Sequence, residues 1–284
     1  MAVFYNKATL SYNGIVTDSN IVTGELVETV SITKTPLQTE YINGDVMTYV
    51  INLRNSGTAA LTELSVTDNL GAYDVGETTV YPLTYVEGSI AYFVDGALQT
   101  TPAVIDTTGL TINGISIPAG GNAAIIYQAR VNDYAPPTAD GSVTNTAAVS
   151  GNGIVGETTA TATINTQEAP RLSITKSLCP TTVTESGVIA YTFVIDNVGN
   201  TEAGEAANVV ITDTFTPILK NIVVTLDGRV LEAGTDYTYD ETTGVFSTVV
   251  GRITVPAADY SQDAQTGLWS VDPGTTTLVV SGTV

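Results

Sequence analysis

Histidine is absent from this chain of 284 residues, and Cys179 is its only cysteine. The absence of histidine excludes Ser-His-Asp and Cys-His catalysis, and with a single cysteine it also excludes zinc sites built from these residues. One cysteine cannot form a disulfide within the chain, so we expect Cys179 to be a buried or half-exposed small apolar residue, or else half of a bond between chains. Any covalent staple within the chain must use other side chains.

Charged residues are also scarce, at 13% of the chain, and the few basic ones leave a formal net charge of −20. Nucleic-acid binding needs clustered lysine and arginine, and an anionic membrane repels an acidic chain. We therefore expect neither nucleic acid nor a membrane as a partner. There is no D-x-D-x-D-G calcium loop either, so we predict no metal and no cofactor.

A period of two runs along most of the chain, as in Val46–Leu53, where Met47, Tyr49, Ile51 and Leu53 form one face and the more polar set Val46, Thr48, Val50 and Asn52 forms the other. Turn pairs such as Asn13-Gly14 and Asp95-Gly96 interrupt this alternation at strand-length spacing. Helical periodicity is limited to a weak stretch at 257–265. The pattern is typical of an all-β sandwich protein.

A long internal repeat divides the chain into two parts. The matching segments are Val30–Gly57 (VSITKTPLQTEYINGDVMTYVINLRNSG) with Leu172–Gly199 (LSITKSLCPTTVTESGVIAYTFVIDNVG), and Ser65–Leu70 with Val210–Phe215. The length is sufficient for two domains of ordinary size. We predict two tandem immunoglobulin-like β-sandwich domains, at 28–166 and 167–284, joined by the polar linker Asn165–Pro170.

Residues 1–27 resemble the end of a repeat, although they stand at the beginning of the chain. Asn6–Val16 (NKATLSYNGIV) matches Asn145–Val155 (NTAAVSGNGIV), with asparagine, alanine, serine and the run Asn-Gly-Ile-Val identical. The second copy closes the first domain, whereas the second domain reaches Val284 without such a hairpin. We therefore expect the second domain to lack its last hairpin and to borrow one from another molecule.

The expected donor is the hairpin at 1–27 of an identical subunit, as in donor-strand complementation. The residues expected to fill the acceptor core are Phe4, Ala8 and Leu10, with Ile15 and Ile21 on the return strand. Such a head-to-tail homopolymer grows into an open filament unless rotation closes a ring. Two alternatives remain open: the hairpin folds back into its own chain, or the sequence is a piece of a longer array.

Strand parity places a lysine and an aspartate inside each domain, with an asparagine from the closing strand. The first domain has Lys34, Asp68 and Asn145, and the second has Lys176 and Asp213 with Asn6 supplied by a neighbouring subunit. One interpretation is a buried ion pair to which the asparagine is hydrogen-bonded, because a buried charge is costly unless it is paired.

The other interpretation is an isopeptide bond, since desolvation lowers the pKa of a lysine and raises that of an aspartate. The neutral amine would attack the asparagine carboxamide while the protonated aspartate polarises its oxygen, and ammonia would leave. The order Lys, Asp, Asn resembles the cross-linking domains of Gram-positive pilins and collagen adhesins. The resemblance implies a Lys34–Asn145 bond within the chain, a Lys176–Asn6 bond between chains, and Asp68 and Asp213 as the promoting acids.

The pattern TKT…GD-x-x-TY…N-x-G…V-x-D-x-L…TN-x-A-x-V resembles the "conserved repeat" domain of bacterial surface proteins, domain of unknown function 11. The resemblance implies an immunoglobulin-like fold and an extracellular place on a cell or endospore surface. The first residues lack a signal-peptide pattern, which favours either an endospore appendage assembled inside the mother cell or a mature form.

We expect a structural filament subunit rather than an enzyme. The alternative is a surface adhesin, a binding module that would use the tyrosine-rich stretch Gly71–Gly96.

Overall fold

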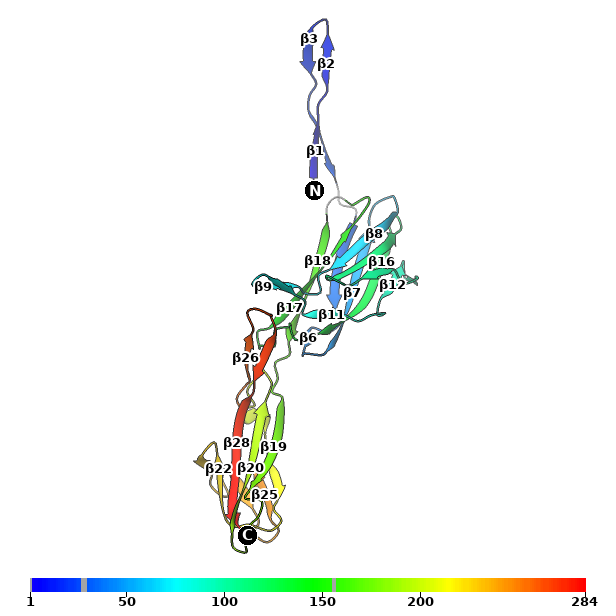
Figure 1. The fold of residues 1–284 in the computed structure, drawn as a ribbon. Helices are drawn as coiled ribbons and strands as arrows, with labels where there is room; N and C mark the ends of the chain where they lie inside the picture. Colours follow the sequence, from blue (N-terminus) through cyan, green and yellow to red (C-terminus); the bar gives the residue numbers. More distant parts are fainter. Residues whose placement is uncertain (1, 27–29, 155–156) are drawn as a thin grey trace. The chain divides into compact units, whose positions relative to one another are not determined.

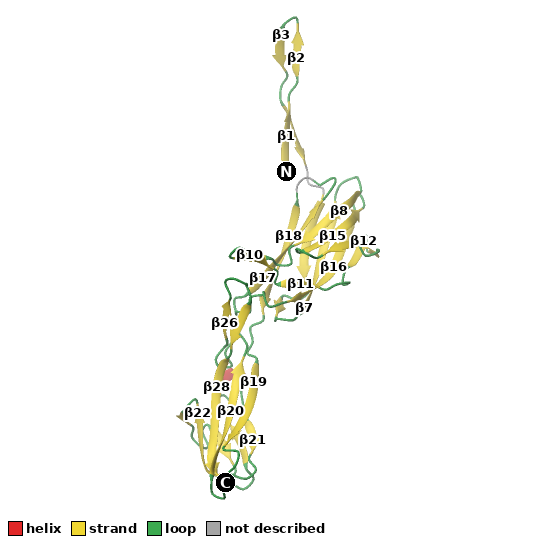
Figure 2. Cartoon of the chain, in the orientation of Figure 1, coloured by secondary structure: helices red, strands yellow, loops and turns green. Residues whose placement is uncertain are grey.

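The computed structural model describes residues 2–26, 30–154 and 157–284 (Figure 1). These residues form strands and loops, with a single 3-10 turn, η1 (Glu205–Ala207), as their helical element (Figure 2). The predicted all-β class is confirmed. None of the described elements is a helix long and apolar enough to span a membrane. The chain divides into unit 1, Met1–Pro136 with Ser142–Asn165, and unit 2, Pro137–Gly141 with Thr166–Val284.

Unit 1 contains a sandwich of two six-stranded sheets. In the first sheet the order is β13-β12-β16-β7-β5, with β11 also on β16, and in the second it is β14-β15-β8-β17-β18-β6. The first-sheet strands are β5 (Val30–Pro36), β7 (Val46–Asn55), β11 (Leu83–Tyr85), β12 (Ala91–Val94), β13 (Ala97–Leu98) and β16 (Asn122–Val131). The second-sheet strands are β6 (Glu40–Tyr41), β8 (Leu61–Asp68), β14 (Ala103–Ile105), β15 (Leu110–Ile117), β17 (Ser142–Ser150) and β18 (Thr158–Thr166). A separate hairpin joins β9 (Tyr73–Val75) and β10 (Thr78–Val80).

The core of unit 1 lies between these two sheets. Alternate residues of β7 point into it, and they are Met47, Tyr49, Ile51 and Leu53. Burying each such side chain stabilises the fold by about 1.5–3 kcal/mol. The hairpin β17–β18 completes the second sheet, because β17 pairs with the free edge of β8 and places Ala147 opposite Asp68.

Unit 2 repeats the first sheet but has a shorter second sheet. The first sheet has the order β19-β20-β28-β22-β23, formed by β19 (Leu172–Cys179), β20 (Val188–Asn197), β22 (Lys220–Leu226), β23 (Arg229–Val230) and β28 (Gly274–Thr283). The second sheet contains β21 (Thr212–Thr214), β25 (Val245–Thr248) and β24 (Tyr237–Tyr239). By sequence, β21 corresponds to the end of β8. Among the described residues of unit 2, no strand takes the place beside β21 that β17 takes beside β8.

The weak helical periodicity at 257–265 was misleading. This stretch forms β26 (Asp259–Gln262), which pairs with β27 (Trp269–Asp272). The intervening turn is held by Asp263, whose Oδ1 accepts hydrogen bonds from the backbone N–H groups of Gln265 at 2.9 Å and Thr266 at 2.7 Å. An aspartate that binds its own following backbone in this way favours a turn over a helix.

The N-terminal residues form a hairpin of four short strands. β1 (Ala2–Asn6) pairs with β4 (Val22–Leu26), and β2 (Thr9–Tyr12) pairs with β3 (Ile15–Asp18). Asn13 and Gly14, both with positive φ, form the two-residue turn at its tip, as Asn-Gly turns in hairpins commonly do. In the described part of the chain these four strands pair only with one another. We refer to residues 2–26 as the donor hairpin, after the role predicted for them from the sequence.

Candidate functional site

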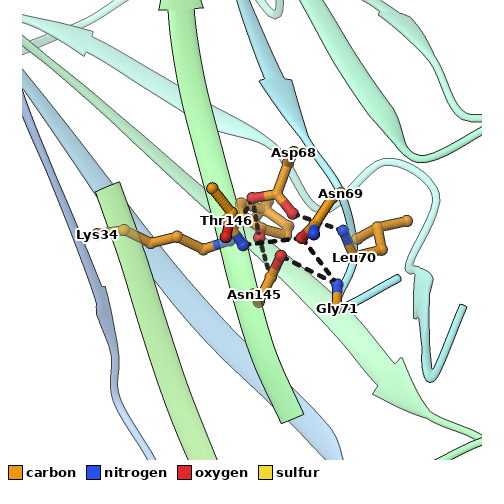
Figure 3. Close-up of polar contacts among 8 residues, drawn as sticks. Lys34, Asp68, Asn69, Leu70, Gly71, Asn145 and Thr146 are labelled. Atoms are coloured by element: carbon orange, nitrogen blue, oxygen red, sulfur yellow. Dashed lines mark hydrogen bonds and ion pairs between the residues drawn. The ribbon is translucent and has the colours of Figure 1, made fainter. Parts of the chain in front are cut away.

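The structure brings together the three residues predicted for the site in unit 1. Lys34 follows Val30 and Ile32 on the buried face of β5, Asp68 ends β8, and Asn145 lies on the inward face of β17. Lys34 Nζ donates a hydrogen bond of 2.6 Å to Asp68 Oδ2, and both side chains are fully buried. Figure 3 shows Lys34 and Asn145 reaching this cluster from different strands. All three residues lie at buried positions of their strands.

The structure adds Tyr127, which the sequence reasoning missed. Its hydroxyl donates to Asp68 Oδ2 at 2.6 Å and accepts a hydrogen bond of 3.0 Å from Asn145 Nδ2. Asn145 Oδ1 instead accepts a bond of 3.3 Å from the backbone N–H of Gly71. Asp68 thus reaches Asn145 through Tyr127, and the amide oxygen that the aspartate was expected to polarise faces a backbone donor.

Burial sets the electrostatics of this cluster. Desolvation lowers the pKa of Lys34 to about 8, although the charge and hydrogen bond of Asp68 oppose that shift. Lys34 Nζ lies 4.9 Å from the ring centroid of Tyr49, which stacks on the ring of Tyr127. Burial and the charge of Asp68 raise the pKa of Tyr127 well above its ordinary value, so its phenol stays neutral. An amine with a lowered pKa is a better nucleophile near neutral pH than an ordinary lysine.

Backbone contacts fix β17 against the end of β8. Asn69 Oδ1 accepts hydrogen bonds from the N–H groups of Thr146 at 2.8 Å and Gly71 at 3.1 Å, and the Asn69 N–H donates to the Thr146 carbonyl. Gly71 has a φ of +74°, and a Cβ there would lie 2.5 Å from Val143 Cγ1. Glycine is therefore required where the chain passes the amide of Asn145.

Unit 2 has the same ion pair in an open setting. Lys176 Nζ donates to Asp213 Oδ2, but the lysine side chain is 41% exposed and the aspartate side chain 17% exposed. Lys176 Nζ lies 4.6 Å from the ring centroid of Tyr191, which corresponds to Tyr49. Val280 stands opposite Tyr191 as Tyr127 stands opposite Tyr49, so the hydroxyl of unit 1 has no counterpart on this strand.

The strand that carries Lys176 shows how open this face is. In unit 1, Val30 and Ile32 of β5 are 4% and 8% exposed. The corresponding residues of β19, Leu172 and Ile174, are 41% and 55% exposed. In unit 1, β17 lies against β5. Unit 2 therefore exposes an apolar face beside its ion pair.

Both faces of the donor hairpin carry exposed apolar side chains, with Leu10, Tyr12 and Ile15 on one face of β2–β3 and Val16 on the other. Phe4, Leu10, Ile15 and Ile21, which were predicted to enter an acceptor core, are all exposed. Phe4 lies over Gly24, where a Cβ would come within 2.3 Å of its ring. On the other face Asp18 accepts hydrogen bonds from Lys7 at 2.6 Å and Thr9 at 2.9 Å.

The predicted donor residues Asn6 and Ala8 are exposed on this hairpin as well. Asn6 belongs to unit 1, whereas Lys176 and Asp213 belong to unit 2. The proposed second site is thus divided between two separate parts of the chain.

The tyrosine-rich stretch Gly71–Gly96 serves packing in unit 1. It forms β9 to β12, and β11 and β12 join the first sheet. Tyr92 is buried, and Tyr81 and Tyr85 pack against the same core. The adhesin alternative therefore gains no exposed cluster from these three tyrosines.

No family model and no curated protein matches the chain, so membership of the conserved-repeat family stays a prediction. Similar solved structures include the pilus backbone protein RrgB of Streptococcus pneumoniae (16% identity, TM-score 0.36, covering 86% of this chain and 55% of that one). The major pilin subunit BcpA of Bacillus cereus has 13% identity and a TM-score of 0.36, over 96% of this chain and 73% of that one. The collagen-binding domain of a Staphylococcus aureus adhesin has 12% identity and a TM-score of 0.32, over 50% and 99%.

This chain thus spans about 55% of the length of the RrgB structure. At these TM-scores the similarity carries no argument about function.

Proposed function

We propose that this protein is the structural subunit of an extracellular bacterial filament on a cell or spore surface. Identical copies join head to tail, and the donor hairpin of one subunit completes unit 2 of the next. One observation carries the proposal: the donor hairpin has the inward sequence of β17 but is exposed, while unit 2 exposes the face that β17 covers in unit 1.

The register of unit 1 predicts how the donor hairpin docks. Because Ala147 lies opposite Asp68 and Val149 opposite Val66, Ala8 should lie opposite Asp213 and Leu10 opposite Ile211. Asn6 then takes the position of Asn145, next to the ion pair of unit 2. The pairing also satisfies the backbone groups on the free edge of β21, which would otherwise invite non-specific association.

Burial supplies the driving force for this assembly. At about 1.5–3 kcal/mol for each large apolar side chain, the four exposed residues Phe4, Leu10, Ile15 and Ile21 contribute about 6–12 kcal/mol before association and ordering costs are subtracted. Leu172 and Ile174 of the acceptor add to this burial. The interface joins two different surfaces, so each added subunit presents a new acceptor and growth continues.

The same proposal includes two covalent bonds. In unit 1 the neutral amine of Lys34 forms a bond from Nζ to Asn145 Cγ, the bond from Cγ to Nδ2 breaks, and ammonia leaves. Between subunits Lys176 forms the corresponding bond to Asn6, with Asp213 as the acid. Docking buries Lys176 as Lys34 is buried, so the two lysines then have similar surroundings. The interchain bond therefore follows assembly rather than preceding it.

A pair of single substitutions tests the assembly. Leu10→Asp places a charge on the face of the donor hairpin that is predicted to enter the acceptor core, whereas Val16→Asp places the same charge on the opposite face. Both residues are exposed in the single chain, at 60% and 65%, so neither change should unfold it. By electron microscopy we expect filaments from the unsubstituted protein and from Val16→Asp, and dispersed subunits from Leu10→Asp.

Monomers from the unsubstituted protein, or equal filaments from both variants, would contradict the proposal. The unsubstituted protein would remain monomeric if the hairpin closed its own chain. It would also remain monomeric if further residues of a longer chain covered the acceptor face.

A further inference from the structure

The hydroxyl of Tyr127 joins the two groups that must exchange a proton in unit 1. It donates to Asp68 Oδ2 at 2.6 Å and accepts from Asn145 Nδ2 at 3.0 Å. The orientation of the amide is fixed independently, because its Oδ1 accepts from the N–H of Gly71. The amide nitrogen of Asn145 therefore faces the Tyr127 hydroxyl. Its oxygen faces the backbone N–H of Gly71 (Figure 3).

The ion pair itself does not require this tyrosine. In unit 2 Lys176 and Asp213 pair although Val280 occupies the corresponding position. There the other aspartate oxygen accepts a hydrogen bond of 2.8 Å from the backbone N–H of Thr214. The Tyr127 hydroxyl is therefore not needed for the ion pair, and besides Asp68 it contacts the amide of Asn145.

We propose that Tyr127 is a proton relay from Asp68 to the leaving nitrogen of Asn145. The inference rests on the proposed Lys34–Asn145 bond and adds a group to its chemistry. Gly71 has the complementary position, since its N–H meets the amide oxygen on which negative charge develops. A phenol that stays neutral suits a relay, because it receives one proton as it gives up another.

The proton path balances without an added reactant. Lys34 first passes an ammonium proton to the Asp68 carboxylate, and the resulting amine forms a bond to Asn145 Cγ. Protonated Asp68 then donates to the Tyr127 oxygen while Tyr127 gives its own proton to Nδ2, and the Cγ–Nδ2 bond breaks. Asp68 removes the surplus proton from the new amide nitrogen. The products are the isopeptide, ammonia and a neutral Asp68 carboxyl.

Tyr127→Phe tests the relay, with Tyr92→Phe as the matched control. Both changes remove one hydroxyl from a buried tyrosine of unit 1, but the Tyr92 hydroxyl bonds to the carbonyl of Ser116. Each full-length chain is made in a short pulse of cell-free synthesis, and its intact mass is followed over time for the loss of one ammonia. Peptide mapping then identifies the linked residues, and the rates are compared in H₂O and D₂O.

Removing a general acid slows such reactions by about 10²–10⁴-fold, so we expect Tyr127→Phe to lose ammonia at least about 100-fold more slowly than the unsubstituted chain. Tyr92→Phe should react at the unsubstituted rate. The solvent isotope effect, the ratio of the rates in H₂O and D₂O, should be larger with Tyr127 than with Phe, because the relay moves two protons. A tyrosine with a purely structural role would leave this ratio the same in both proteins.

Equal rates for Tyr127→Phe and the unsubstituted chain would overturn the relay and leave the bond intact. An unsubstituted chain that keeps its ammonia would overturn both the bond and the relay.

Discussion

Replacing Asn145 with leucine should reveal the titration of Lys34 in the stability of unit 1. Asn145→Leu keeps the branched shape of the side chain and removes the carboxamide, so the lysine keeps a free amine. Its pKa is about 8 in the folded chain and ordinarily about 10.4 in an unfolded one. Between these values the unfolded state binds more protons, so the free energy of unfolding rises with pH. The gain between about pH 8 and about pH 9.5 is about 1.5 kcal/mol.

The free energy of unfolding rises with pH because burial lowers the pKa of Lys34. The folded state bears the cost of burying a charged lysine below that pKa, and this cost is relieved as the pH rises through it. The window ends near pH 9.5, because the raised pKa of Tyr127 opposes the trend once tyrosines of the unfolded chain ionise. The single tryptophan, Trp269, lies in unit 2, so unit 1 is followed by amide hydrogen exchange in β7 and β16.

The control for this experiment is the triple variant Lys34→Met, Asp68→Leu, Asn145→Leu. Its site is apolar, so the site should add nothing to the free energy of unfolding as the pH rises. Equal pH dependence in the two proteins would refute the reasoning.

Three further predictions concern the acceptor face, the interchain bond and the turn at Gly71. Ile174→Asp should abolish filaments but change monomer stability by less than about 0.5 kcal/mol, because Ile174 is exposed, whereas Ile32→Asp at the buried position should destabilise unit 1 by several kcal/mol. Urea unfolding measures the two stabilities and electron microscopy detects the filaments. Equal destabilisation by the two substitutions would count against an open acceptor. Asn6→Ala should still assemble, but its filaments should dissolve to monomers in hot detergent where the unsubstituted ones give a ladder; identical ladders would exclude Asn6 as the linked residue. Gly71→Ala should lower the unfolding free energy of unit 1 by about 1–3 kcal/mol, because its φ is +74° and Val143 occupies the Cβ position; unchanged stability would show that the turn relaxes freely.

Much of the unit 1 site was predictable, because strand parity needs no knowledge of distant contacts. Lys34, Asp68 and Asn145 each occupy an inward position on a strand, and the repeat pointed to the same positions in unit 2. Tyr127 was overlooked because a comparison of repeats favours shared residues, and Val280 stands at its place in unit 2. The available signal was a tyrosine at an inward position of β16, directly opposite Tyr49.

Local sequence was less informative about turns. The dipeptide Asn-Gly forms the tight two-residue tip of the donor hairpin at Asn13-Gly14, but at Asn152-Gly153 it follows the end of β17 without closing a two-residue turn. The pairing of β17 with β18 decides the difference, because it sets Val149 opposite Thr158 and leaves more residues between the strands. Tertiary pairing thus overrides the turn propensity of the dipeptide.

A reconstruction of the assembled protein by electron cryo-microscopy tests the central claim most directly. The account predicts β2 of one subunit beside β21 of the next, with Ala8 opposite Asp213 and Asn6 against the amine of Lys176. A donor hairpin packed within its own chain, or a β21 edge left free between joined subunits, would contradict it.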